Sequence, residues 1–357
     1  MKSRGENKAK STYKNGDVIL LLKDITGKVF PLKTETREKL LQSGVHYCEM
    51  LPEEYKPTKQ YMDIYEETLD VFAEATAKAV SIVSEKIYKR KKGHPVIISL
   101  ARAGTPVGVL IKHYLREKYG VDVPHYSVSI IRGRGIDKNA MKHILENYDP
   151  EDLQFVDGWT GKGAIFRELE EALKEYPKID VSLAVVADPA GITELCGTHD
   201  DILIPSSCLN STVSGLVSRT FLRSDVISET DFHGAAFYEN LKEEDRTYEF
   251  IDRIEKEFQF NLSIRIRSLN KRGIRTVEEI KRKYGVADIN FIKPGIGETT
   301  RVLLRRVPWK ILVDERYKDS AELRHIFRLA KEKNVEIELT QLSNYKCIGI
   351  IKDLADV

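Results

Sequence analysis

Short apolar runs alternate with amphipathic stretches over the first two thirds of the chain. Apolar residues recur at helical spacing in 62–93, 107–120 and 164–176. The uninterrupted apolar runs that alternate with them are 95–100, 125–131, 153–158 and 181–188. Apolar strands that alternate with amphipathic helices are typical of a parallel α/β sheet covered by helices. A hairpin is also predicted from the alternating pattern of 17–24 and 27–32.

A smaller α/β unit is predicted near the C-terminus. Its expected strands are INFI (289–292), WKILVDE (309–315), VEIELT (335–340) and CIGII (347–351), with helices at 298–306 and 319–333. We therefore divide the chain into a main domain at 15–260, a linker or helical region at 261–289 and a small domain at 290–357.

The composition indicates a two-domain protein of the cytoplasm. Its 357 residues are 41% apolar, and its four cysteines form no CxxC pair, so neither a zinc site nor a disulfide framework is expected. The N-terminus lacks the apolar core of a signal peptide, and no apolar run reaches membrane-spanning length.

Charge is unevenly distributed along the chain. Residues 251–357 contain 23 Lys and Arg against 16 Asp and Glu, a net +7, whereas the rest of the chain sums to −5. A basic C-terminal part predicts a polyanionic partner. The alternative is a charged surface that is simply solvated.

The loop DGWTGKG (157–163) lies between an apolar run and an amphipathic stretch. Ligands bind beyond the carboxyl ends of parallel strands, where glycines let backbone N–H groups crowd around an anion at a helix start. We expect Asp157 to face ribose hydroxyls or a metal ion. The residues expected to bind phosphate are Gly158, Thr160, Gly161, Lys162 and Gly163.

Two further loops also follow predicted strands, SLARAGTPVG (99–108) and IIRGRGID (130–137). The first places Arg102 where a guanidinium can grip a diphosphate in a bidentate manner. Three such loops in one domain predict a ligand with more than one phosphate. The residues expected to contribute from these two loops are Arg102, Ala103, Gly104, Thr105, Arg132, Arg134 and Asp137.

Several long segments resemble one bacterial family. They are SGVHYCEMLPEEY (43–55), SLARAGTPVG, PHYSVSIIRGRGID (124–137), FVDGWTGKG (155–163), ADPAG (187–191), LIPSSCLNSTVSGLVSRT (203–220) and DFHGAAFY (231–238). Over roughly residues 15–250 the chain resembles the phosphoribosyltransferase-like StiP family, associated with tellurite-resistance and stress gene clusters. The resemblance implies a type I phosphoribosyltransferase-like parallel sheet with flanking helices.

The resemblance also implies a chemistry. A phosphoribosyltransferase-type enzyme would bind phosphoribosyl diphosphate or a ribonucleotide together with Mg²⁺. Asp157 would steady the ribose, and Arg102 would hold the diphosphate. Type I phosphoribosyltransferases usually have two adjacent acids at this point, and here Gly158 occupies the second position.

The StiP family is also labelled a cysteine protease, which implies a thiol nucleophile as the alternative. Cys208 lies among small hydroxyl residues, and His233 is the candidate base, oriented by Asp231 or Asn210. A buried structural thiol is the competing interpretation of Cys208. Cys196 and His199 have the spacing of a metal-binding pair but lack further ligands in the sequence.

The C-terminal segments GIGETTRVLLRRVPWKILVDE (295–315) and NYKCIGII (344–351) resemble the Pelota-type RNA-binding domain, a small α/β/α fold. The resemblance implies an RNA partner. The residues expected to contact RNA are Gly297, Glu298, Arg301 and Arg305. A third interpretation of the whole chain is a non-catalytic, nucleotide-sensing RNA-binding protein.

Overall fold

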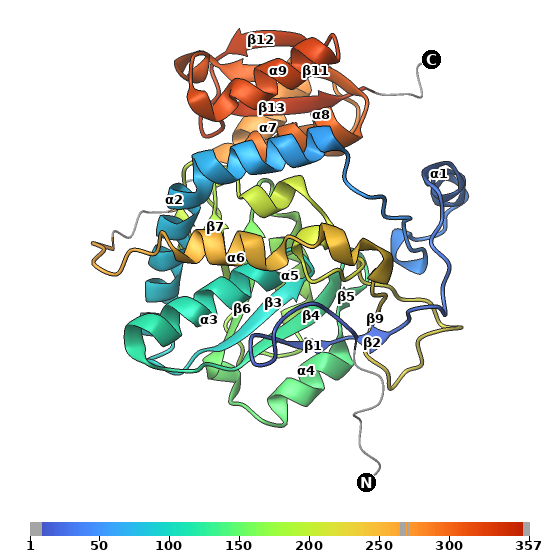
Figure 1. Cartoon of the computed structure of the whole chain (residues 1–357), viewed down its shortest axis with the longest axis vertical. Helices are drawn as coiled ribbons and strands as arrows, with labels where there is room; N and C mark the ends of the chain where they lie inside the picture. Colours follow the sequence, from blue (N-terminus) through green and yellow to red (C-terminus); the bar gives the residue numbers. More distant parts are fainter. Residues whose placement is uncertain (1–8, 265–268, 270, 353–357) are drawn as a thin grey trace.

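The computed structural model describes residues 9–264, 269 and 271–352 (Figure 1). Among these residues, a central sheet of seven strands has the order β1-β4-β3-β6-β7-β8, with all its neighbours parallel except β5, which pairs antiparallel with β4. Its strands are β1 (Ile19–Leu21), β3 (Val96–Ala101), β4 (His125–Ile131), β5 (Gly135–Ile136), β6 (Leu153–Trp159), β7 (Leu183–Ala187) and β8 (Cys196–Thr198). The predicted parallel α/β sheet is confirmed.

Helices cover both faces of the central sheet because alternate residues of each strand point to opposite faces. In β3, Ile97 packs with the helices of one face, whereas Val96 and Ile98 pack with those of the other. The first face is covered by α2 (Lys59–Arg90), α3 (Thr105–Tyr119) and α6 (Thr247–Glu255), and the second by α4 (Lys138–Leu145) and α5 (Ala164–Leu173). The described helix α1 (Thr34–Gln42) lies at the periphery (Figure 1).

The predicted hairpin at 17–32 is wrong. Ile19–Leu21 joins the central sheet beside β4, and β2 (Lys23–Asp24) pairs in parallel with β9 (Gly234–Ala235). The first predicted strand, 17–24, contains β1 and β2, whereas 27–32 forms no strand. The pattern contained no information on the partners of β1 and β2, which lie more than 100 residues away.

The C-terminal domain has a four-stranded sheet of order β10-β13-β11-β12. Its elements are β10 (Ile292–Pro294), β11 (Pro308–Asp314), β12 (Glu336–Thr340), β13 (Cys347–Ile351), α7 (Arg272–Lys283), α8 (Ile296–Arg305) and α9 (Arg324–Glu332). Helix α7 falls in the range expected to be a linker, and its Val277 and Ile280 pack against this sheet. No helix of the described residues is long and apolar enough to cross a membrane.

The two domains are packed together rather than strung on a linker (Figure 1). Ile296 and Leu303 of α8 belong to the same apolar cluster as Leu209 and Val213 of the main domain. Polar contacts add to this junction, since the Tyr345 hydroxyl donates to the Gly161 carbonyl over 2.7 Å. The junction therefore places α8 above the carboxyl end of the central sheet.

Replacing Gly197 of β8 with alanine should destabilise the main domain. An added Cβ would lie 2.1 Å from the Ala79 carbonyl oxygen of α2, so the helix backbone must move. We expect the free energy of unfolding in urea to fall by about 1–3 kcal/mol. Gly158→Ala is the matched control, because a Cβ there would lie 3.7 Å from Ile204 in ordinary contact. Equal stability of the two variants would contradict this account of the packing between β8 and α2.

Candidate functional site

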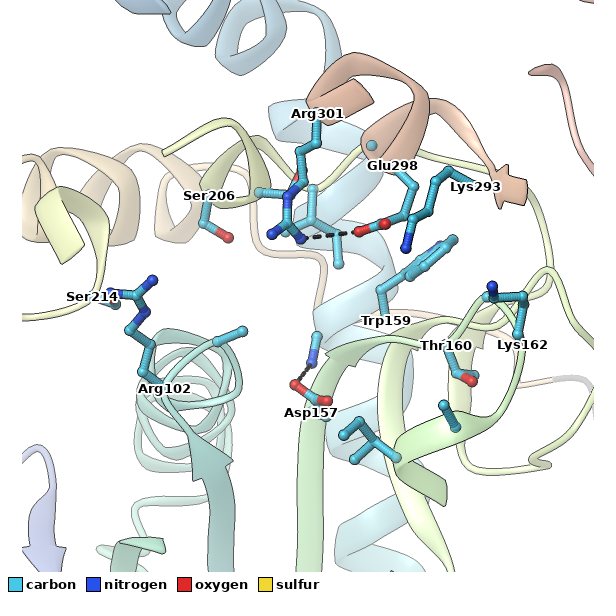
Figure 2. Close-up of a pocket in the computed structure, with 18 of the residues that line it drawn as sticks. Arg102, Asp157, Trp159, Thr160, Lys162, Ser206, Ser214, Lys293, Glu298 and Arg301 are labelled. Carbon is cyan, nitrogen blue, oxygen red and sulfur yellow. Dashed lines mark hydrogen bonds and ion pairs between the residues drawn. The ribbon is translucent and has the colours of Figure 1, made fainter. Parts of the chain in front are cut away.

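A cavity of about 320 Å³ lies between the carboxyl end of the central sheet and α8 (Figure 2). The end of β6 and the loop that follows it, from Asp157 to Gly163, form much of its wall. The start of α3 and the segment 206–214 form further wall, and the C-terminal domain contributes the rest. The residues that line the cavity include Arg102, Ala103, Arg132, Asp157, Gly158, Trp159, Thr160, Gly161, Lys162, Gly163, Ser207, Lys293, Gly297, Glu298 and Arg301.

Asp157 lies at the floor of this cavity, near the carboxyl end of β6 (Figure 2). Its Oδ1 accepts a hydrogen bond from the Gly158 N–H over 2.8 Å. Burial raises the pKa of the carboxyl to about 6, and the Gly158 hydrogen bond only partly opposes that rise. Asp157 therefore titrates closer to neutral pH than an ordinary aspartate.

Cations occupy the opposite wall of the cavity. Lys162 donates to the carbonyls of Ile289 and Ile292, at 2.9 and 3.1 Å, and so reaches across to the C-terminal domain. Burial, followed by the nearby charge of Lys293, lowers the pKa of Lys162 to about 8. Arg301 pairs with Glu298 at 2.9 Å.

The residues predicted from the other two loops are divided between the cavity and the surrounding protein. Arg102, Ala103 and Arg132 line the cavity. Arg102, however, donates to Glu54 and to the Val217 carbonyl, both over 3.1 Å, so its guanidinium already has partners.

The remaining predicted residues of these loops have structural contacts. The Thr105 hydroxyl bonds Ser127 over 2.8 Å, and a Cβ on Gly104 would lie 2.7 Å from the Val156 carbonyl oxygen. Arg134 pairs with Glu49 on the surface. Asp137 accepts from the Ala140 N–H at the start of α4, which makes it a helix cap.

The cavity does not fit the Mg²⁺ site implied by the sequence. Magnesium prefers several oxygen ligands in octahedral geometry, and carboxylates commonly provide the charged ones. Here Glu298 is paired with Arg301, which leaves Asp157 as the other carboxylate among the described lining residues. We therefore derive no step through magnesium.

Cys208 and His233 have separate surroundings, and no hydrogen bond joins their side chains. The Cys208 sulfur lies 3.5 Å from the Thr68 hydroxyl of α2, and burial raises the pKa of this thiol to about 11. His233 Nδ1 lies 2.8 Å from the Ser129 hydroxyl of β4. A thiol with so high a pKa is a poor nucleophile at neutral pH.

The residues considered as orienting groups for His233 are also engaged elsewhere. Asp231 pairs with Lys23 at 2.7 Å, and the Asn210 side chain accepts from Arg305. The structure thus favours the structural interpretation of Cys208, which packs beneath α2 and the segment 205–213.

A different cysteine meets a histidine and an acid. The Cys196 sulfur on β8 lies 3.4 Å from His199 Nε2, and His199 Nδ1 donates to the Asp188 carbonyl over 2.9 Å. The Asp188 carboxylate lies 3.5 Å from the same Nδ1. These three residues form the group of possible metal ligands found among the described residues.

Asp188 is fixed by the loop that follows β7. Its carboxylate accepts from the N–H groups of Gly191, Ile192 and Thr193 at 2.7–3.0 Å. Burial nevertheless raises the pKa of the carboxyl to about 7. Asp188 could not be connected with Cys196 and His199 from the sequence, because it is distant from them along the chain and the pairing of β7 with β8 brings them together. The signal available in the sequence was the motif ADPAG, which ends a predicted strand.

Cys48 also contacts a histidine. Its sulfur lies 3.0 Å from His46 Nδ1, and burial raises the pKa of the thiol. The Cys48 N–H also points to this Nδ1, at 3.4 Å, so His46 caps the short helix that begins at Tyr47. This contact is therefore part of a local cap.

The predicted RNA-contacting residues of α8 lie at the junction with the main domain, although the Arg301 side chain is 45% exposed. Gly297, Glu298 and Arg301 line the cavity. Arg305 is partly buried and donates to the Cys208 carbonyl over 2.6 Å. In the docked arrangement these side chains form part of the domain junction.

Comparison with known proteins places the chain in a family. Residues 11–255 match the family described as "Tellurite-like stress resistance cysteine protease StiP", and residues 271–353 match the family described as "PELOTA RNA binding domain". The chain is 33% identical to the "Cysteine protease StiP" of Acinetobacter baylyi, over 96% of this chain and 94% of that protein. The chain belongs to the StiP family.

The phosphoribosyltransferase function expected from the sequence is therefore wrong. Both the matching family and the A. baylyi relative are named as cysteine proteases. The local geometry agrees with this correction. Arg102 is paired with Glu54, and Asp157 is the single unpaired carboxylate where a metal-bound sugar would need more than one.

Replacing Asp157 with asparagine should change how stability depends on pH. Because the folded pKa of about 6 exceeds the ordinary value, the wild-type protein loses stability as pH rises from about 4 to 6. Asparagine keeps an acceptor for Gly158 but carries no charge. We expect equal stability at pH 4 and a variant more stable by roughly 1–3 kcal/mol at pH 7.5, measured by urea unfolding.

Asp200→Asn is the control, since Asp200 is an exposed acid near the end of β8. It should follow the wild-type curve at both pH values. Parallel curves for wild type and Asp157→Asn would show that the Asp157 carboxyl is not held in a desolvated site.

Proposed function

We propose that this protein is a cysteine-dependent hydrolase that cleaves peptide bonds with Cys196 as nucleophile and His199 as base. Membership of a family named for cysteine proteases supports the reaction class. The observation that favours this pair is the contact of a thiol with an imidazole that a third group orients, as catalytic cysteines require.

The hydrogen bond to the Asp188 carbonyl sets the tautomer of His199. With its proton on Nδ1, the ring presents the Nε2 lone pair to the Cys196 thiol. Nε2 takes the thiol proton as Sγ bonds to the carbonyl carbon of the substrate. The same proton then passes to the leaving amine, and water hydrolyses the thioester to release the acid and restore the thiol.

Access to the thiol depends on the surroundings of His199. Cys196 is buried, whereas the His199 side chain is 17% exposed, so substrate approaches from the histidine side. The loop after Asp188 is also held by the C-terminal domain, because Asn344 donates to the Pro189 carbonyl over 2.8 Å. Movement of that loop would widen the approach to the sulfur.

Cys196→Ala should abolish hydrolysis of a fluorogenic peptide mixture, and His199→Gln should lower kcat at least about a hundredfold, because the general base is lost. Cys208→Ala and Cys48→Ala serve as matched thiol controls and should retain activity within a few fold. A chelator should leave the rate unchanged, since the group acts as nucleophile and base. Full activity of Cys196→Ala, or loss confined to Cys208→Ala, would contradict the proposed site.

The C-terminal domain carries a second proposed function, RNA binding, supported by its match to the Pelota family. Since Gly297, Glu298 and Arg305 of α8 lie at the domain junction, we place the contact on the exposed Trp309 and the side chains around it, where Lys283 and Lys310 also pair with Glu338. The Trp309 ring is 44% exposed and lies 6.5 Å from the Tyr284 ring, between centroids. Lys283 and Lys310 lie over the Tyr284 ring at 4.9 and 5.7 Å.

Trp309→Ala should weaken binding of a single-stranded RNA oligonucleotide by about 1–3 kcal/mol, because an exposed aromatic ring stacks on a base. Fluorescence anisotropy measures the change. Arg301→Gln is the control and should bind RNA as the wild type does. A larger loss in Arg301→Gln than in Trp309→Ala would instead assign RNA binding to α8.

A further inference from the structure

The cavity between the domains contains more positive than negative charge. Five of its lining residues are cationic and two are acidic. Of the acids, Glu298 is paired with Arg301, and Asp157 lies at the floor, away from the cations on the upper wall (Figure 2). Arg102 is paired with Glu54 from outside the lining. The surplus therefore rests on Arg132, Lys162 and Lys293.

These cations lie close enough to repel one another. Burial lowers the pKa of Lys162 to about 8, with Lys293 and Arg132 adding to the effect. Burial also lowers the pKa of Lys293, and Arg306, Arg132 and Arg301 lower it further. Such crowding costs folding free energy, which a bound anion would recover.

The start of a helix borders the same cavity. Helix α5 begins at Ala164 after Gly163, which has a φ of +71° and provides no side-chain cap. The first-turn residues Ala164, Ile165 and Phe166 all line the cavity. The unpaired N–H groups and the dipole of a helix start favour an anion. On the facing wall, the buried Ser207 hydroxyl has no hydrogen-bond partner.

We propose that this cavity binds a small multivalent oxyanion, held jointly by Arg132 and Lys162 of the main domain and Lys293 of the C-terminal domain. Several convergent cations favour a ligand with more than one negative charge. A volume of about 320 Å³ lies in the range of small-molecule sites and limits the ligand to a compact one. Compounds with several phosphate or several carboxylate groups both have the required negative charge. The proposal concerns binding alone and involves no group transfer.

A ligand that contacts both domains stabilises the arrangement in which they are docked. Because the cations come from both sides of the junction, the complete site exists only when α8 is docked. The anion therefore stabilises the docked state by its affinity for that state alone. This inference does not depend on the proposed hydrolase, since it uses neither Cys196 nor His199.

Isothermal titration calorimetry of the full chain tests the site with inorganic pyrophosphate and with citrate, at constant ionic strength and with acetate as the monovalent control. We expect pyrophosphate, citrate or both to bind the wild type and acetate not to bind. Lys162→Met and Lys293→Met should each weaken binding at least tenfold, because each removes a charged hydrogen-bond donor. Lys293→Arg, which keeps the charge, should restore most of the affinity.

Two controls separate this site from other effects. Lys331→Met removes an exposed lysine of α9 and should bind as the wild type does, and Cys196→Ala should also bind normally. Binding should take up protons near pH 8 and weaken between pH 7 and 9, because the anion raises the pKa of Lys162 again.

The two anions also distinguish the ligand source. Tighter binding of pyrophosphate assigns the site to phosphate compounds, and tighter binding of citrate assigns it to polycarboxylates. The absence of heat with both anions would overturn the proposal. Equal affinity in wild type, Lys162→Met and Lys293→Met would also overturn it, by placing the anion elsewhere.

Discussion

One buried carboxylate, that of Asp201, anchors the junction on which both candidate sites depend. Its Oδ1 accepts from the Ile296 N–H over 3.0 Å, and its Oδ2 accepts from the Lys346 N–H over 2.8 Å. Burial raises the pKa of Asp201 to about 6, and these two N–H donors are what favours the charged form. A buried charge with two donors from the other domain ties the domains in one arrangement, since separation would remove both partners.

The position of α8 follows from that arrangement. Its first two turns carry Gly297, Glu298 and Arg301 to the carboxyl end of the central sheet, where they complete the cavity. Arg305, one turn further, is partly buried against the segment that contains Cys208. The C-terminal domain therefore does two things at once: it forms a wall of a cationic cavity, and it holds the loop that orients His199 through Asn344.

Sequence reasoning succeeded where the relevant physics is local. Apolar periodicity located α2, α3, β4 and β6 to within a few residues, because the spacing of apolar residues follows the period of the helix or strand that buries them. The loop from Asp157 to Gly163 was correctly expected at a sheet edge, since strand ends in a parallel sheet meet there. Strand pairing is not local, and so the predicted hairpin at 17–32 was wrong: 17–24 contains β1 and β2 with distant partners, and 27–32 forms no strand.

The candidate site depended on contacts that spacing cannot reveal. Cys208 and His233 were paired on residue type, but their side chains contact Thr68 and Ser129 instead. The sequence did not connect Asp188 with Cys196 and His199, which β8 places beside it. Lys293 was missed altogether, because its role arises from docking of a domain that begins far beyond the loop it faces.

The identity of the nucleophile is the central claim, and covalent labelling tests it most directly. The native protein is treated with a substoichiometric peptidyl chloromethyl ketone, and mass spectrometry maps the adduct among Cys48, Cys196, Cys208 and Cys347. A thiol activated by an oriented imidazole reacts first, so the account predicts an adduct on Cys196 that disappears in His199→Gln. An adduct on Cys208 or Cys48, with Cys196 unmodified, would contradict it.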